Sequence, residues 1–489
     1  MMSLTALDIW AVAPEIVVAT MACLVLVVDV YTRSLQPCAL AYPLAIGTLI
    51  AGAAISLMGL YEAPQLALNG LVIRDGVADV LKTGTCLGAA AVLFYARDYA
   101  RERGLWRGEY LVLALFGVVG MMTMIAAAHL LTLYVGIELL ALCLYGMIAM
   151  ERDSVRAAEA AMKYFILGAL ASGVLLYGMS LLYGLTGSLS LVTVSQASTT
   201  LSSESLPLML AIAMVVVGLL FKLGAVPFHM WVPDVYDGSA TSTTLYLSAV
   251  PKLAAFAILL RLLFSGLGDW IEIWQDMLAV AAVLSIALGN VVAIAQTSIK
   301  RMLAYSTISN MGFLLLGFFA GTAAGYSAAM AYAVIYMVAT LAVFGVILAL
   351  TRPGFESDLL DDFRGLNERN PWLAFLMLTV MFSLAGIPPT AGFFAKLMVL
   401  QAALGSGFIE IVVVAAILAV VGAFYYLRVV KLMYFDSPQP GVLKISAQGY
   451  RRSAIWVLTA NAILLIAITP WIGKTIDFVA FSFVHLDLP

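Results

Sequence analysis

The sequence predicts an all-α polytopic membrane protein with about 14 transmembrane helices, which include two inverted five-helix repeats and two discontinuous helices. Three observations support this prediction: the composition, a regular succession of apolar segments, and the distribution of lysine and arginine. Apolar residues make up 63% of the 489 residues and charged residues only 11%, against roughly 25% charged in an ordinary soluble domain. A soluble fold could not bury so much apolar surface, so we expect much of it to face lipid.

Apolar windows of about 20 residues, the length that crosses a bilayer core, follow one another along the chain between Pro, Gly and charged breaks. The fourteen expected spans lie near 10-30, 40-60, 77-96, 110-127, 130-150, 160-184, 206-226, 240-262, 273-295, 302-320, 326-350, 372-400, 408-430 and 454-477. They form a single membrane domain, 1-489, which we divide into an N-terminal three-helix segment (1-97), a first five-helix repeat (110-262), a second (273-431) and a C-terminal helix (454-478).

Basic residues test this count, because short cytoplasmic loops collect Lys and Arg. With both termini on the periplasmic side of a bacterial inner membrane, the inner loops hold seventeen of them: Arg33, Arg97, Arg101, Arg103, Arg107, Arg152, Arg156, Lys300, Arg301, Arg352, Arg364, Arg369, Arg428, Lys431, Lys444, Arg451 and Arg452. The outer side keeps Arg74, Arg261 and Lys474. The residues before the first apolar run include Asp8 but no Lys or Arg, unlike a signal peptide, so we expect the first span to be retained.

Several classes of function find no support in the sequence. The net charge of -3 and the absence of a basic tail give no sign of a nucleic-acid partner. No GxGxxG or Walker sequence occurs, and the cysteines are isolated from one another: Cys23, Cys38, Cys86 and Cys143. The three histidines, His129, His229 and His485, are far apart. We therefore expect no nucleotide, metal or redox cofactor in this chain.

The remaining basic residues are five lysines within or at the edge of apolar spans: Lys82, Lys163, Lys222, Lys252 and Lys396. A charge at the bilayer centre costs roughly 2.5 to 3.5 kcal/mol, so such residues usually mark ion or proton pathways. Lys82 is the exception, since a local pair with Asp79 or snorkelling to the surface would explain it, and we assign it no role.

One of these lysines, Lys163, and one carboxylate, Glu138, need separate treatment. Lys163 is expected about a turn inside its helix, so snorkelling and a role in a water channel both stay open. Glu138, in LLTLYVGIELLALCLYGM, is the only carboxylate expected at mid-span depth in the first half of the chain. A buried carboxylate requires a nearby cation.

Two of the expected spans contain an interruption of the helix. Irregular backbone at membrane depth is tolerated only where protein or water satisfies the freed backbone groups. In FKLGAVPFHMWVPD, Pro227 follows Lys222 closely and lacks the N–H that would bond to a carbonyl one turn earlier. In FSLAGIPPTAGFFAK, two prolines precede Lys396. Paired interruptions point to the transport site of an inverted-repeat carrier, although kinks that serve only packing remain the alternative. The repeat is inexact, because Lys222 precedes its break and Lys396 follows its own.

These residues carry a resemblance to a known family. The run FKLGAVPFHMWVPDVYDGSATSTTLYLSAVPKLAAF resembles the signature of the antiporter-like subunits of respiratory complex I and of the multisubunit Na+/H+ antiporters. YVGIELLALCLYGM, AQTSIKRMLAYSTISNMGF and AGIPPTAGFFAK agree, so the resemblance covers nearly the whole chain. Within the family the chain is most similar to the subunit N branch of bacterial NADH-quinone oxidoreductase, the counterpart of mitochondrial ND subunit 2.

The choice among branches depends on details. Subunit M usually has glutamate where Lys396 stands here, and the antiporters differ around Lys252 in SAVPKLAAF. Subunit L extends into a long lateral helix, which we do not expect in this chain.

The resemblance implies roles for matching positions. Glu138 and Lys222 would form a coupled pair, Lys252 a central relay and Lys396 the terminal proton-bearing residue toward the outer side, with His229 and water bridging the lysines. An anion beside a buried ammonium favours the protonated form and burial disfavours it, so moving Glu138 away would expel a proton.

The resemblance also implies a setting. FMN, iron-sulfur clusters and quinone (ubiquinone) would belong to other subunits of the complex. Expected partners are the neighbouring antiporter-like subunit M, the small subunits K and J, the lateral helix of subunit L, and lipids.

Two other functions remain possible at this stage. The same buried lysines would serve a multisubunit cation/proton antiporter. Alternatively, the chain is a structural membrane anchor in which buried charges only fix the register of the helices.

Overall fold

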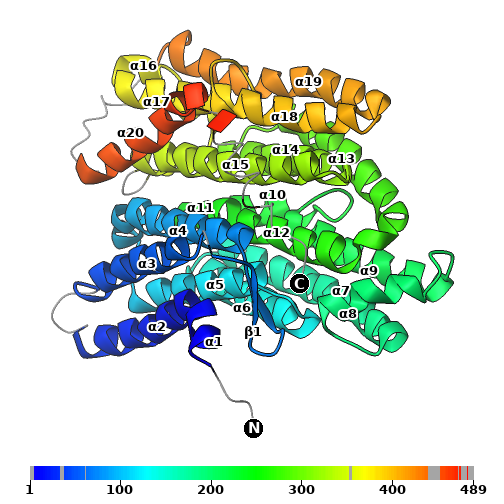
Figure 1. Ribbon diagram of the computed structural model, residues 1–489. Coiled ribbons are helices and arrows are strands. Elements are labelled where there is room, and N and C mark those ends of the chain that lie inside the picture. The colour runs from blue at the N-terminus through cyan, green and yellow to red at the C-terminus, as the bar shows by residue number, and fades with distance from the viewer. Residues whose placement is uncertain are drawn as a thin grey trace.

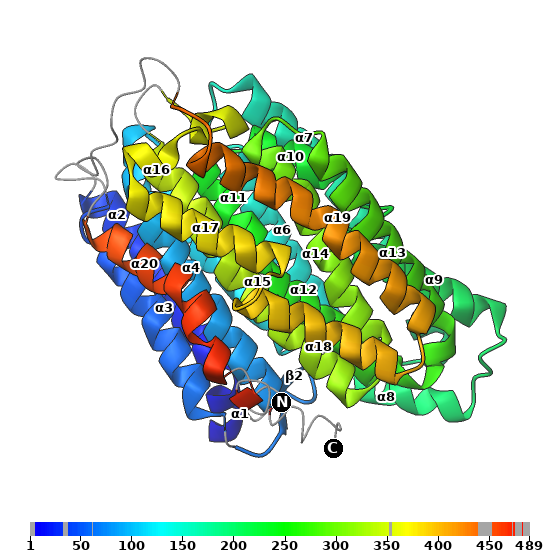
Figure 2. The same ribbon diagram turned by 90° about the horizontal axis from the view of Figure 1, so that it is seen from above.

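The computed structural model describes residues 5–32, 38–60, 62–351, 355–438, 452–471, 473–474 and 482. Its secondary structure is almost entirely helical, apart from a short antiparallel hairpin of β1 (Gln65–Ala67) and β2 (Val72–Arg74). The long helices lie nearly parallel to one another (Figure 1). Figure 2 looks down on the same bundle and shows the helices of the second half of the chain in front.

The first half of the chain forms the lower layers in Figure 1. Its elements are α1 (Ala6–Ala11), α2 (Ala13–Thr32), α3 (Ala41–Met58), α4 (Gly76–Glu102), α5 (Gly108–Ile125), α6 (Leu130–Ile148), α7 (Val155–Thr186), α8 (Leu191–Gln196), η1 (Ala197–Thr199), α9 (Leu206–Leu223), α10 (Trp231–Gly238), α11 (Thr241–Ala249), α12 (Pro251–Leu259) and the π-helical η2 (Leu260–Gly266).

The second half forms the upper layers. Its elements are η3 (Gly268–Trp270), α13 (Ile271–Ile294), α14 (Ile299–Phe319), α15 (Ala323–Leu350), η4 (Leu360–Phe363), α16 (Leu366–Arg369), α17 (Pro371–Ala385), α18 (Ala391–Gly405), α19 (Ile409–Tyr434), α20 (Arg452–Ala467) and η5 (Thr469–Trp471).

Twelve helices of the described residues are long and apolar enough to cross a membrane. The shorter apolar helices α17 and α18 follow each other across a break, and the apolar part of α20, Ala454–Ala467, is the remaining one. Counting α17 with α18 as one interrupted span gives fourteen. The prediction of about 14 helices with two interruptions is thus confirmed, whereas the inverted-repeat relation and the domain limits stay predictions.

The centre of the bundle is formed by α11, α12, α14 and α15, whose residues are nearly all buried, while α2 and α19 lie at the periphery. Helix α15 packs on α4, α11 and α12 of the first half and on α14, α17 and α18 of the second. It therefore joins the two halves through one continuous apolar core.

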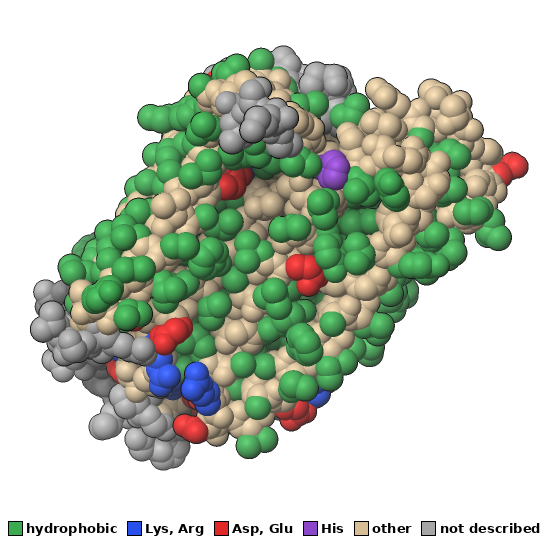
Figure 3. All heavy atoms as spheres, turned by 90° about the horizontal axis from the view of Figure 1, so that it is seen from below, with side chains coloured by type: hydrophobic (Ala, Val, Ile, Leu, Met, Phe, Trp, Pro, Cys, Tyr) green, Lys and Arg blue, Asp and Glu red, His purple; other side chains and the backbone are tan. Residues whose placement is uncertain are grey.

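Charged residues separate along the bundle axis. Arg103, Lys300, Arg301, Arg364 and Arg428 lie together at one end of the bundle, which we call the basic end, where Arg103 pairs with Glu356 and Lys300 lies 3.2 Å from Asp358. Figure 3 shows a face of the molecule that is mainly hydrophobic, with the Lys and Arg side chains gathered at one edge. This segregation is expected of a membrane-spanning bundle.

At the opposite end, two arginines that the sequence analysis counted on the outer side are buried in ion pairs. Arg261 donates to both carboxylate oxygens of Asp75, at 2.7 and 2.9 Å, and Arg74 lies 3.3 Å from Asp79. Both arginines are almost fully buried. Each arginine is compensated by a carboxylate, which the cost of burying a charge demands.

The expectation for Lys82 was wrong. This lysine neither snorkels nor pairs with Asp79, because its side chain is 0% exposed and its Nζ lies 2.7 Å from Oε1 of Glu15 on α2. Asp79 is turned instead toward Arg74. The Glu15–Lys82 pair therefore ties α2 to α4 inside the N-terminal segment.

Candidate functional site

The first interrupted helix ends in a Schellman motif. Gly224 adopts the left-handed conformation with φ of 76°, its N–H donates to Phe221, and the N–H of Ala225 donates to Leu220 at 2.9 Å. This motif satisfies the carbonyls of Leu220 and Phe221 but leaves the last one, that of Leu223, without a backbone donor. Pro227, four residues later, has no N–H to offer it.

Lys252 uses this free carbonyl. Its Nζ donates to the carbonyl oxygen of Leu223 at 2.8 Å and lies 5.7 Å from the centroid of the Trp231 ring. The lysine comes from α12 and is almost fully buried. A cation at a helix C-terminus interacts favourably with the helix dipole, and the aromatic face adds a second weak attraction.

The second interrupted helix repeats this arrangement. Gly386 is left-handed with φ of 83°, and the N–H of Ile387 donates to Phe382 at 2.9 Å, which completes another Schellman motif. Lys396 on α18 donates to the carbonyls of Leu384 and Ala385, at 2.8 and 3.1 Å. The first break therefore presents one carbonyl to the buried Lys252, and the second presents two carbonyls to the half-buried Lys396.

Lys222, at the end of α9, faces the same region as Lys252. Its Nζ lies 3.2 Å from the hydroxyl oxygen of Ser172 on α7. Lys222 and Lys252 line one cavity together with Tyr164 and Trp231, and about 30 Å³ of it is open to the centres of water molecules. One water needs about 10 to 15 Å³ of such space, so the cavity can hold water between the two lysines.

Glu138 does not form the direct ion pair with Lys222 that its predicted role suggests. Among the described residues no carboxylate lies within 4.0 Å of the Lys222 ammonium, whose hydrogen bond goes to Ser172. Glu138 is half-buried, its Oε1 is buried without a hydrogen bond, and it acts electrostatically on Lys222. The two charges are therefore coupled through space, without direct contact.

The two remaining predicted residues lie outside this cavity. His229 is half-buried in the turn before α10 and is not among the residues that line the cavity between the lysines. Lys163 lies more than two turns into α7, deeper than expected, and its ammonium is 2.8 Å from both Glu159 and Asp234. Because this side chain is 42% exposed, it occupies a solvated ion cluster.

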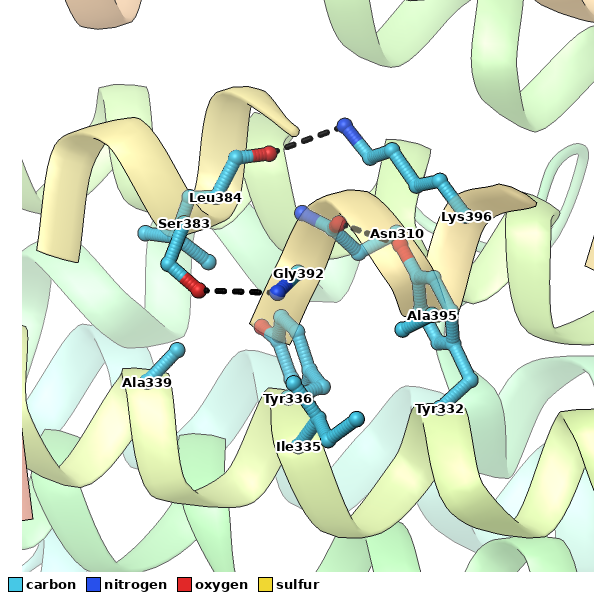
Figure 4. A pocket seen from close by; sticks show the side chains of 10 residues that line it. All are labelled: Asn310, Tyr332, Ile335, Tyr336, Ala339, Ser383, Leu384, Gly392, Ala395 and Lys396. Atoms are coloured by element: carbon cyan, nitrogen blue, oxygen red, sulfur yellow. Dashed lines mark hydrogen bonds between the residues drawn. The ribbon is translucent and has the colours of Figure 1, made fainter. Parts of the chain in front are cut away.

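The sequence analysis missed the polar groups around Lys396. Asn310 and Tyr332 line a second small cavity with Ser383 and Lys396, and the Tyr332 hydroxyl donates to Asn310 at 2.6 Å (Figure 4). A signal was present, because Ser306 and Asn310 stand four residues apart in an otherwise largely apolar span and so share one helix face.

The arrangement suits proton transfer. Lysine and carboxylate side chains can exchange protons with water held in the cavities. No group of three or more potential metal ligands occurs among the described residues. Buried ionisable residues of this kind form the proton relays of membrane pumps and transporters.

Comparison with known proteins agrees with this class. Residues 127–422 match the family described as NADH:quinone oxidoreductase/Mrp antiporter, TM. The chain is 54% identical to NADH-quinone oxidoreductase subunit N of Thiobacillus denitrificans over 454 residues, which cover 91% of this chain and 94% of the relative.

Two solved structures show the fold. A chain of respiratory complex I from Thermus thermophilus with bound aureothin matches with a TM-score of 0.79 and 30% identity, covering 95% of this chain and 99% of that one. A chain of the Mrp complex from Dietzia sp. matches with a TM-score of 0.83 and 21% identity, covering 98% of each. At that identity the second match shows the fold alone.

The fold and the two lysine sites define a polytopic membrane protein of the antiporter-like class. By sequence, the chain belongs to the NADH-quinone oxidoreductase subunit N family within that class.

Proposed function

We infer that this chain is a proton-translocating membrane subunit of NADH:quinone oxidoreductase, and that it moves protons through buried lysines and water without redox chemistry of its own. One observation carries the mechanism: Lys252 and Lys396 each donate to carbonyls freed at a helix break within the membrane. A carbonyl accepts a stronger hydrogen bond from an ammonium than from a neutral amine. The geometry of each break therefore controls how firmly its lysine holds a proton.

In the first half of the chain, Lys222 and Lys252 exchange protons through water in their shared cavity. Glu138 is the charge that biases this exchange, since a carboxylate nearby favours the protonated form of Lys222. Lys252 passes the proton toward the second half, and Lys396 is the terminal carrier. The shared cavity supports the first transfer, and the through-space coupling of Glu138 to Lys222 supports its role.

Two residues keep auxiliary roles in this proposal. His229 stands beside the first break, and a neutral imidazole there can accept and release a proton near working pH. Lys163 joins Asp234 at 2.8 Å, and Asp234 also lies 3.1 Å from Arg301 at the basic end. This ion cluster is the proposed entry to the Lys222 region.

The same mechanism assumes two inverted repeats, 110-262 and 273-431. In both, the fourth membrane span is the interrupted one and ends in a Schellman motif. In both, the first two helices approach closely at glycines: a Cβ on Gly120 would lie 2.8 Å from the backbone of Leu140, and one on Gly289 would lie 2.6 Å from that of Ser309. Five crossings per repeat reverse the orientation of the next repeat.

We further propose the setting of the chain. It lies in the bacterial inner membrane with the basic end at the cytoplasm and both termini on the periplasmic side. Subunit M, the small subunits K and J, the lateral helix of subunit L and lipids surround it. FMN, iron-sulfur clusters and the quinone site belong to other subunits.

The alternative, a multisubunit cation/proton antiporter, receives less support. The chain is 54% identical to the subunit N of Thiobacillus denitrificans, whereas it shares 21% identity with the chain of the Mrp complex. Purification of this chain from membranes separates the two functions. A complex that contains FMN and iron-sulfur clusters and pumps protons on NADH oxidation in proteoliposomes supports the proposal. Isolation with antiporter subunits alone would refute it.

A further inference from the structure

Asn310 is held from both ends of its side-chain amide in the middle of α14. This helix begins at Ile299 near the basic end, so at 1.5 Å per residue Asn310 lies about 16 Å along it. Its Nδ2 donates to the backbone carbonyl of Ser306 at 2.8 Å, and its Oδ1 accepts from the Tyr332 hydroxyl at 2.6 Å. The side chain is almost fully buried.

These contacts fix which way the amide points. A backbone carbonyl can only accept, so the amide nitrogen must face Ser306 and the amide oxygen must face Tyr332. The single proton of the Tyr332 hydroxyl is then committed to Asn310. The lone pairs of Tyr332 remain free to accept from another donor.

On one side of the amide lies the cavity of Lys396. Asn310, Tyr332 and Lys396 line it, and about 20 Å³ is open to the centres of water molecules, enough for one water. In Figure 4 the side chains of Asn310 and Tyr332 meet below that of Lys396, whose ammonium points toward Leu384. A water here can accept from Lys396 and donate to Tyr332.

On the other side, one turn closer to the basic end, lies a pair of hydroxyls. The Ser306 and Tyr426 hydroxyl oxygens are 2.5 Å apart, and Asn310 Nδ2 lies 3.2 and 3.3 Å from them. Among the described residues, the only hydrogen-bonded connection from this pair to Tyr332 runs through the Asn310 amide.

We propose that Asn310 is a proton barrier that separates the water cavity beside Lys396 from the Ser306–Tyr426 hydroxyl pair on the basic-end side. The proposal rests on the inferred role of Lys396 as a proton carrier. Water and hydroxyl groups relay protons because each can donate and accept in turn. An amide cannot do so readily: a proton would have to bind Oδ1 while another leaves Nδ2, and the imidic acid formed would have to revert. A proton on Lys396 is thus kept from returning to the basic end.

The isosteric variant Asn310→Asp tests the barrier. A buried carboxyl is neutral when protonated and then carries one donor and one acceptor oxygen, so it can take a proton on one side and release one on the other. In proteoliposomes that hold the intact complex, we expect NADH oxidation to continue, the proton-to-electron ratio to fall, and passive proton permeability to rise. Asn290→Asp is the matched control, because Asn290 is a buried amide of α13 that donates to Leu418 and accepts from the Tyr425 hydroxyl at 3.2 Å on the side of the hydroxyl pair, but does not line the Lys396 cavity. Equal ratios and permeabilities in the two variants would overturn the proposal.

Two further variants keep the test decisive if Asn310→Asp fails to assemble. Tyr426→Phe removes one hydroxyl on the basic-end side, so a barrier at Asn310 predicts a wild-type proton-to-electron ratio. Asn310→Leu cannot relay protons, so it should show no added permeability even if its stability falls. Loss of pumping in Tyr426→Phe would show that the hydroxyl pair conducts protons, and would exclude the barrier.

A last variant separates this proposal from the proposed function. Lys396→Met should lower pumping if Lys396 carries protons, and adding it to Asn310→Asp should abolish the new permeability. Normal pumping in Lys396→Met alone would show that Lys396 carries no proton, and would therefore reject its role in the proposed function. A leak that persists in the double variant would reject the barrier only.

Discussion

The ammonium of Lys252 lies 2.8 Å from the carbonyl oxygen of Leu223, the last residue of the helix that Pro227 interrupts. Because this carbonyl has no backbone donor, the lysine supplies the hydrogen bond that the break removed. The protein thus places a buried lysine, the proposed proton carrier, where an unsatisfied acceptor already exists within the membrane.

Replacement of Lys252 tests this contact. We expect Lys252→Ala to leave the complex assembled but to lose most coupled proton pumping, because the relay group is gone. Lys252→Arg keeps a permanent cation near the Leu223 carbonyl, so it should assemble well and also pump poorly. The measurement is the proton-to-electron ratio in proteoliposomes. A wild-type ratio in Lys252→Ala would reject the relay role.

Gly386 offers a test of the second break. Its φ is positive, and a Cβ there would lie 2.9 Å from Cδ of Lys396. The left-handed conformation costs an alanine about 1 to 2 kcal/mol, so we expect Gly386→Ala to lower both thermal stability and coupled turnover. Gly405→Ala is the control, since a Cβ there would meet no atom within 4 Å apart from its chain neighbours and the nearby backbone of its own helix. Equal activity and melting temperature in both variants would contradict the proposed geometry.

Much of the site was predictable because its signals are local. An apolar span is recognised by length, a break by proline and glycine, and a buried lysine by its cost in lipid, so Lys252, Lys396 and both interruptions follow from the chain itself. The proline even indicates which carbonyl is freed. What the sequence could not show is that Lys252, from another helix, takes the carbonyl next to Lys222. Lys252 lies on the span that follows its break and Lys396 on the second part of its own interrupted span, yet each donates to a carbonyl at the end of a helix that breaks.

Long-range partners explain the errors. The nearest carboxylate to Lys82 in sequence is Asp79, but its partner Glu15 comes from a different helix. Arg261 was counted on the outer side by its position in the chain, which could not show that it lies buried against Asp75. The position of Asn310 beside Lys396 likewise depends on how α14 and α18 pack. Sequence patterns define the faces of helices, and tertiary structure decides which faces meet.

The Glu15–Lys82 pair predicts a stability effect without a direct effect on pumping. Lys82→Met leaves Glu15 buried without its cation, and breaking a buried pair costs roughly 3 to 5 kcal/mol. We expect a lower melting temperature of the solubilised complex, recovered in part by adding Glu15→Gln. Lys431→Met, at an exposed lysine of α19, is the control. A single Lys82→Met variant as stable as this control would contradict the role of the pair.

The orientation of the bundle can be tested by labelling. With the basic end at the cytoplasm, cysteines at Ser188 and Gly405 should react with an impermeant thiol reagent from the periplasmic side, and one at Asp153, in the loop after α6, should not. The background protein carries Cys23→Ser, since the other three cysteines are buried. Gly449, a position that also follows from the predicted inner loops, lies outside the described residues. Labelling of Asp153→Cys in sealed right-side-out vesicles would reverse the proposed orientation.

Substitutions of Glu138 and Lys222 distinguish proton transfer from a purely structural role. Glu138→Gln removes a charge that acts on Lys222 through space, so Lys222 loses its electrostatic support and most coupled activity should disappear. Glu138→Asp keeps the charge and should retain partial activity, because no direct contact depends on the length of the side chain.

Lys222→Arg separates the charge from the ability to release it. Its guanidinium stays protonated in any protein environment, so the attraction to Glu138 persists while proton release is lost. We therefore expect Lys222→Arg to assemble as wild type and to pump poorly, whereas a residue that only fixes helix register would tolerate the change. Blue-native gels report assembly, and proteoliposomes report the proton-to-electron ratio. If the ratio of Lys222→Arg equals that of the wild type, Lys222 lies outside the proton path, and its charge serves only to hold α7 and α9 in register through Ser172.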